Sequence, residues 1–130
     1  MATIKKYQAG GVAVAANTFV KLDESTQTAT QTSSTAVDTL GVQLNATSAA
    51  GETAYVCVEG ECLCLAADAI EPGEGVRASS EGKAMSADAP LEAELGIFYG
   101  GLSDGSYTAT AANDLITIYV HSHKGYVRPE

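Results

Sequence analysis

Residues 40–65 read LGVQLNATSAAGETAYVCVEGECLCL, and this stretch decides the predicted fold. Apolar and small or polar residues alternate over its first five positions, which is the period of a half-buried β-strand. After the turn-rich segment NATSAAGE, the apolar runs Tyr55–Val58 and Cys62–Leu65 stand on either side of Glu59-Gly60. Two such runs separated by two turn residues indicate a hairpin. The stretch therefore predicts a β-meander.

The same design occurs a second time along the chain. Three segments of the first half find counterparts at offsets of 56, 55 and 62 residues, namely Val20-Lys21-Leu22 with Val76-Arg77-Ala78, Leu40-Gly41-Val42 with Leu95-Gly96-Ile97, and Glu52–Val58 with Asp114–Val120. An internal repeat constrains the fold more than individual propensities do. We therefore predict an all-β protein, a small β-barrel, β-tulip or sandwich, built from two similar meander halves over residues 13–65 and 66–120.

Size and charge limit the function classes. A chain of 130 residues forms one domain, and with two Phe and no Trp its core must be aliphatic and modest. Oligomerisation would add to its stability. No run of residues approaches the roughly 20 apolar residues of a membrane span, and a net charge of −9 opposes nonspecific nucleic-acid binding. We expect neither a membrane nor a nucleic acid as partner.

The charges are distributed unevenly. Residues 13–120 carry a net charge of −12, whereas residues 1–12 carry +2 and residues 121–130 carry +1. We predict that residues 1–12 form an extended N-terminal arm with a short strand at Thr3–Tyr7, and that Gly10-Gly11 uncouples this arm from the body. An ordinary frayed terminus is the alternative. Residues 121–130 are predicted as a basic C-terminal tail.

The three cysteines lie close together in the sequence. In a hairpin with a Glu59-Gly60 loop, Cys57 directly faces Cys62, and Cys64 pairs with Tyr55. An odd number of cysteines argues against a disulfide framework and fits a protein made in a cytosol. The pair Cys57 and Cys62 then has two interpretations, either small buried hydrophobes or a cross-strand thiol pair that becomes a disulfide after release from the cell.

Other constellations carry little chemistry. His121 and His123 share one face if the last strand continues, but two histidines without a neighbouring carboxylate cluster predict no metal site. The sequence contains no nucleophile elbow, no H-E-x-x-H motif and no phosphate loop. We expect no catalytic residue, no cofactor and no metal, and therefore not an enzyme. The Thr- and Ser-rich segment from Asp23 to Ala36 is read either as a partner-facing loop or as a polar hairpin.

The order of these elements resembles a known family. Residues 19–61, FVKLDESTQTATQTSSTAVDTLGVQLNATSAAGETAYVCVEGE, are similar to the head decoration, or capsid cement, proteins of tailed bacteriophages. In those proteins a "VKLD"-like turn precedes a small-residue tract, a "GV"-type strand, an "AxAGE" turn and an apolar strand. Residues 70–84, IEPGEGVRASSEGKA, together with ELGIFYGG at 94–101, resemble the companion half.

The resemblance implies a virion structural protein on the outer capsid surface. Such proteins form homotrimers on the shell and stabilise it by cementing neighbouring subunits of the major capsid protein. Their N-terminal arm often adds a strand to a capsid sheet. Carried onto this sequence, capsid binding falls on the arm and the basic tail, that is on Thr3, Ile4, Lys5, Lys6, Tyr7, Lys124, Tyr126 and Arg128.

A fibre-type adhesion module is the alternative function. It would recognise a host receptor or glycan through the loops at Gln27–Ala36 or Leu102–Asn113.

Overall fold

The computed structural model describes residues 2–23, 26–31, 39–79, 81–86, 93–94, 96–102, 111–120 and 126–127. The described part of the chain is all β, and none of it forms a helix long and apolar enough to cross a membrane. Its strands are β1 (Thr3–Ala9), β2 (Thr18–Asp23), β3 (Thr28–Gln31), β4 (Thr39–Gln43), β5 (Thr53–Leu65), β6 (Gly75–Ala78), β7 (Ala84–Ser86), β8 (Ala93–Glu94), β9 (Gly96–Leu102), β10 (Leu115–Val120) and β11 (Tyr126–Val127).

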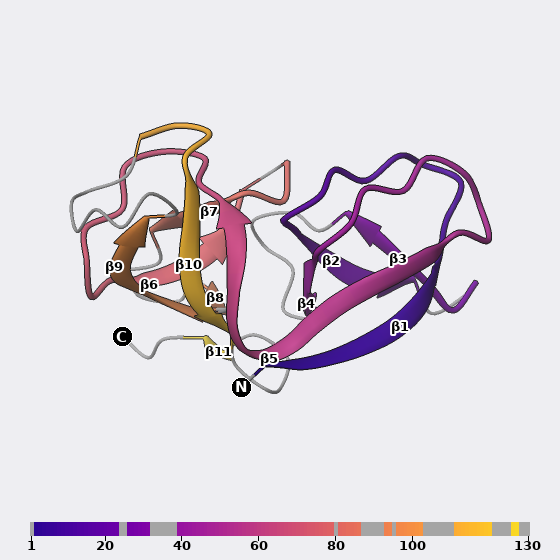
Figure 1. Cartoon of the computed structure of the whole chain (residues 1–130), viewed down its shortest axis with the longest axis horizontal. Helices are drawn as coiled ribbons and strands as arrows, with labels where there is room; N and C mark the ends of the chain where they lie inside the picture. The colour runs from indigo at the N-terminus through magenta and orange to yellow at the C-terminus, as the bar shows by residue number, and fades with distance from the viewer. Residues whose placement is uncertain are drawn as a thin grey trace.

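The long strand β5 joins two lobes, which lie side by side in Figure 1. Its first half belongs to a barrel with the strand order β1-β3-β2-β4-β5, which closes because β1 also pairs with β5. Its second half continues into the order β5-β10-β9-β6-β7. A parallel bridge between Ala66 and Ala84 joins the two ends of this second set. The structure thus confirms a small β-barrel fold, and it contains two such barrels joined through β5.

Equivalent residues pair with each other in the two barrels. Val20 pairs with Gly41 and Val76 with Gly96, at the predicted offsets of 56 and 55. Gln43 pairs with Val56, and Phe98 with Ile118, at offsets of 55 and 62. The parallel contacts that close the two barrels also correspond. Ala9 pairs in parallel with Ala29 in the first barrel, and Ala66 with Ala84 in the second.

The acid before each repeated strand serves the same turn in both barrels. The Glu52 carboxylate accepts a hydrogen bond from the backbone N–H of Ala49 at 2.7 Å, and the Asp114 carboxylate accepts one from Ala111 at 2.8 Å. The carbonyl of each acid then accepts the N–H of Ala9 or Ala66, both at 2.8 Å. The backbone N–H groups of Ser48 and Ala49 both donate to the Glu52 carboxylate, and these two bonds lower the pKa of Glu52. The repeated acid is therefore a turn cap that attaches the first strand of each barrel.

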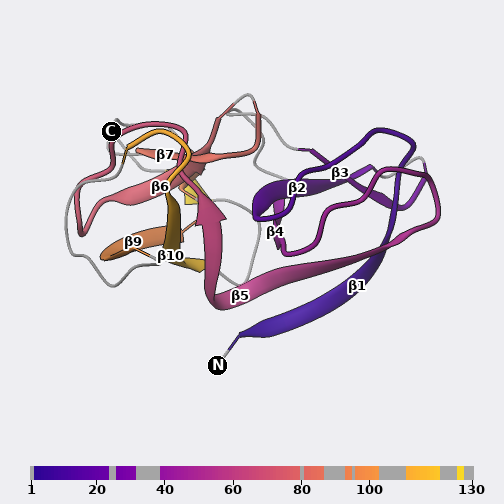
Figure 2. The ribbon, with the colours of Figure 1, turned by 45° about the horizontal axis from the view of Figure 1, so that its top comes forward.

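Two predictions about residues 40–65 need correction. β5 runs unbroken through Glu59-Gly60, so the predicted hairpin is absent and Cys64 pairs with Ile116 rather than with Tyr55. Gly60 has φ 103, and its freedom from a Cβ permits a bend in the strand. Figure 2 shows that β5 bends along its length as it passes from one barrel into the other. The repeat boundary accordingly lies within β5, near Gly60, instead of between residues 65 and 66.

A seam of apolar side chains connects the barrels. The interior of the first barrel contains Val14, Val20, Ala29, Ala54 and Val56, all buried. The larger core fills the second barrel and also includes Phe19, Val42 and Cys57 of the first. These three residues are successive register partners on β2, β4 and β5. They face away from the first interior and pack into the core of the second barrel, so this larger core contains residues of both barrels.

Candidate functional site

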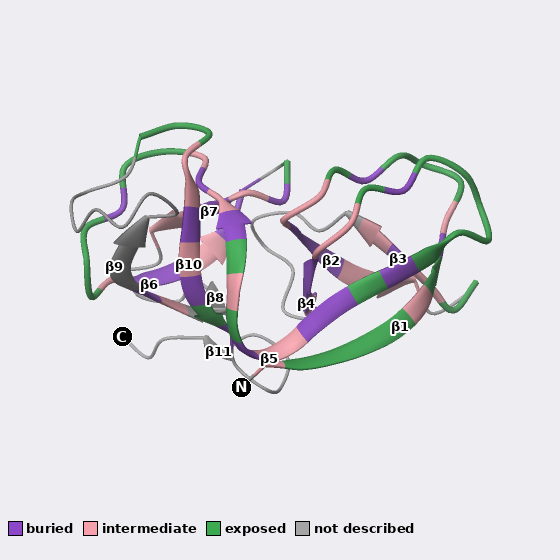
Figure 3. Ribbon diagram, viewed as in Figure 1, coloured by how far each residue is buried: buried purple, intermediate pink, exposed green. Residues whose placement is uncertain are grey.

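The N-terminal segment is a strand of the first barrel rather than an uncoupled arm. β1 pairs with β5 from Thr3 to Gln8, whereas its pairing with β3 is restricted to Gln8 and Ala9. No strand among the described residues bonds to the second edge of Thr3–Tyr7. Figure 3 shows this part of β1 as an exposed ribbon along β5. The predicted arm is therefore part of the first barrel, and one edge of this strand stays open among the described residues.

The side chains along this open edge are basic and apolar. Ile4 is 50% exposed, and the neighbouring Lys5 and Lys6 are exposed as well. The ammonium of Lys6 lies 5.9 Å from the ring centroid of Tyr55, which is its cross-strand partner on β5. Tyr7 is half-buried against the first core and anchors the strand. The edge combines backbone hydrogen-bonding groups with positive charge on an otherwise acidic chain, which fits an extended, acidic partner segment.

The predicted C-terminal residues are only partly placed. Tyr126 lies in β11, where its backbone pairs with Glu94 of β8. Lys124 and Arg128, like His121 and His123, lie outside the described residues. Capsid binding by Lys124 and Arg128 therefore stays a prediction from the sequence.

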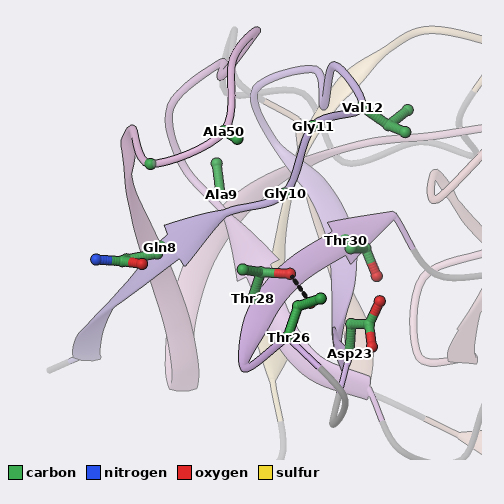
Figure 4. A pocket seen from close by; sticks show the side chains of 11 residues that line it. Gln8, Ala9, Gly10, Gly11, Val12, Asp23, Thr26, Thr28, Thr30 and Ala50 are labelled. Atoms are coloured by element: carbon green, nitrogen blue, oxygen red, sulfur yellow. Dashed lines mark hydrogen bonds between the residues drawn. The ribbon is translucent and has the colours of Figure 1, made fainter.

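A pocket of about 340 Å³ opens where β1 ends and β3 begins in the first barrel, and no sequence motif predicts it. In Figure 4 the end of β1 and the Ala50 turn form one wall, and the end of β2 with the start of β3 forms the other. The lining residues are Gln8, Ala9, Gly10, Gly11, Val12, Asp23, Thr26, Thr28, Thr30, Ala50 and Gly51. The Thr26 and Thr28 hydroxyls share a hydrogen bond of 2.7 Å. The pocket offers hydroxyl groups, one carboxylate and bare glycine backbone.

The cysteines converge, but not as cross-strand neighbours. Cys57 and Cys62 interact through their thiols across the bend of β5, and all three cysteines are free. The hydrogen bond from Cys62 lowers the pKa of Cys57, and the same bond together with burial raises the pKa of Cys62. Burial raises the pKa of Cys64 to about 12. In the described residues, no three His, Cys, Asp or Glu side chains gather as metal ligands.

We expect the native protein to shield Cys64 from alkylation at pH 8. Its pKa of about 12 leaves almost no thiolate, and its side chain is fully buried in the shared core. Mass spectrometry after treatment with iodoacetamide should find Cys64 unmodified in folded protein and modified in urea. Complete labelling of Cys64 within the mixing time in native buffer would contradict this core placement.

Comparisons with known proteins show the fold. No protein-family model and no curated protein sequence matches the chain. Among solved structures, the chain is similar to the head fiber gp8.5 N base of bacteriophage phi29, with a TM-score of 0.70 and 12% sequence identity. The likeness covers 94% of this chain and 98% of that one. The two proteins therefore share an architecture over nearly their whole lengths.

Proposed function

We propose that this chain is a structural protein of a phage virion that binds the outer surface of the capsid. The observation that carries the proposal is the end-to-end likeness to the base of a phage head fibre, which spans 94% of this chain. The order of motifs in the sequence supports the same class of protein independently. In this role the protein acts mechanically, without catalysis.

Binding would proceed by strand addition at the open edge of β1. An extended segment of the major capsid protein pairs with Thr3–Tyr7, and its acidic side chains lie near Lys5 and Lys6. Main-chain hydrogen bonds supply affinity in this mode of recognition, while the flanking side chains supply selectivity. Many such sites repeated over a shell add up through multivalency. A homotrimer on the capsid would join neighbouring capsid subunits and so cement them.

Charge reversal at Lys5 and Lys6 tests this surface. Both side chains are exposed, so Lys5→Glu with Lys6→Glu should leave the melting temperature within a few degrees. Capsid affinity should fall at least about tenfold, because the acidic partner then faces negative charge. The charge-preserving pair Lys5→Arg and Lys6→Arg is the matched control. Co-sedimentation with empty capsids measures both, and equal binding by the reversed and control pairs would remove the edge from the proposal.

A fibre role is the second candidate, because the similar solved structure is the base of a head fibre. In that case the protein attaches a host-binding fibre to the head, or itself recognises a receptor or glycan. Of the predicted recognition loops, only parts of Gln27–Ala36 and Leu102–Asn113 are described. Binding to host cells without binding to capsids, measured with fluorescently labelled protein, would favour this candidate over cementing.

A further inference from the structure

The two barrels carry different side chains at one pair of positions that the repeat makes equivalent. Thr28 precedes Ala29 on β3, and by the offset of 55 residues its counterpart is Lys83, which precedes Ala84 of β7. Gly51 corresponds to Asn113, because the N–H of each donates to the carbonyl of Ala9 or Ala66. Both residues also have positive φ, at 89 and 70. The correspondence therefore holds in backbone geometry.

In the second barrel this place is filled by the protein's own lysine. The Lys83 ammonium donates a hydrogen bond of 2.7 Å to Asn113 Oδ1 and lies 3.8 Å from Glu81 Oε1. The Lys83 side chain thus connects β7 to the Asn113 turn over the top of the barrel.

In the first barrel the same place is the pocket. Thr26 and Thr28 stand where the second barrel has Glu81 and Lys83, and their short side chains bond to each other. Gly51 replaces Asn113, and a Cβ built on Gly51 meets nothing within 4 Å. The first barrel has no lysine at this position, and the space beside Gly51 is open.

The walls of this space suit a cationic side chain. Asp23 places a carboxylate in the lining at the position of Ser79 in the second barrel. Hydroxyls of Thr26, Thr28 and Thr30 add hydrogen-bond acceptors, and a lysine ammonium carries three donors. The pocket itself contains no basic residue among its lining side chains. The carboxylate and the hydroxyl groups therefore complement the charge of a lysine or arginine from outside.

We propose that the pocket of the first barrel receives a lysine or arginine side chain of the capsid protein, in the place that Lys83 occupies in the second barrel. This inference rests on the proposed capsid binding and adds to it a second contact, separate from the edge of β1. The capsid segment would therefore carry a basic residue for the pocket in addition to the acidic residues facing Lys5 and Lys6.

Installing the residues of the second barrel tests the inference. The pair Thr28→Lys and Gly51→Asn rebuilds the lysine–asparagine bond inside the pocket, and asparagine tolerates the positive φ of Gly51. We expect an unchanged or higher melting temperature together with capsid affinity at least about tenfold weaker, since the pocket is then closed. The reverse pair, Lys83→Thr with Asn113→Gly, is the matched control, and it should bind capsids as the wild type does. Wild-type affinity in a folded Thr28→Lys, Gly51→Asn protein would overturn the inference.

A direct titration separates this inference from the capsid proposal. N-acetyl-lysine methylamide and its uncharged norleucine counterpart are added to isotope-labelled protein, and amide shifts are followed by NMR. The lysine compound should shift Gly10, Gly11, Thr28 and Gly51, and the norleucine compound should not. If wild-type protein binds no capsid but these shifts occur, the capsid proposal fails while the cation pocket holds. The pocket inference is refuted if the lysine compound shifts nothing, or shifts the filled variant equally.

Discussion

Replacing Gly41 by alanine should unfold this protein or come close to it. A Cβ at Gly41 would stand 1.9 Å from the carbonyl oxygen of Cys57 and 2.9 Å from its carbonyl carbon. The obstacle is the backbone of a central strand, so no side chain can swing away to relieve it. We expect a loss of more than about 3 kcal/mol, which is a large part of the stability of a small domain. Thermal unfolding followed by circular dichroism measures the effect.

Gly11→Ala is the matched control for this prediction. A Cβ at Gly11 meets nothing within 4 Å, and the residue lies in the first barrel as Gly41 does. Its melting temperature should stay within a few degrees of the wild type. If Gly41→Ala melts at the temperature of Gly11→Ala, β4 and β5 do not approach each other as closely as described.

Phe19→Ala should destabilise both barrels at once. Phe19 is fully buried, and although β2 belongs to the first barrel, its ring packs in the core of the second. Its N–H also donates a 2.7 Å hydrogen bond to the carbonyl of Gly82 in the second barrel. Truncation of a buried phenylalanine costs about 3–5 kcal/mol. The loss should appear as one cooperative transition, since the two barrels share this core.

Hydrogen exchange read by mass spectrometry distinguishes the outcomes of this substitution. Peptides from β4 and from β10 should lose protection together in Phe19→Ala, because global unfolding then exposes both. Val12→Ala is the control, with a side chain 74% exposed and an expected effect within about 0.5 kcal/mol. Loss of protection confined to the first barrel would mean that the seam does not couple the two barrels.

The repeat was predictable from the sequence because it is written in local patterns. Leu40-Gly41-Val42 and its counterpart share an apolar period and a glycine, and the close approach of Gly41 to Cys57 gives that glycine a structural reason. The acid at Glu52 and Asp114 also recurs, and in both barrels it caps the same turn. The repeat could therefore be predicted wherever both halves carry the same short sequence pattern.

Long-range pairing decided what the sequence analysis missed. Glu59-Gly60 satisfies the local rule for a hairpin loop, yet β5 continues because β1 and β4 pair with its first half and β10 with its second. The predicted strand at Thr3–Tyr7 is present within β1, but the prediction that it is uncoupled from the body was wrong for the same reason, since β1 finds its partner some fifty residues away. The pocket has no motif of its own. Its signal is a difference between the two halves, at Thr28 and Gly51 against Lys83 and Asn113, which becomes visible only once the repeats are aligned residue by residue.

The proposed capsid binding is tested by co-sedimentation of the wild-type protein with empty shells of its proposed phage. We expect saturable binding at a fixed number of copies per shell, which salt weakens because charged side chains contribute. The decorated shells should also have a higher rupture temperature. Protein that stays in the supernatant at every concentration, with the rupture temperature unchanged, would contradict the proposed capsid binding.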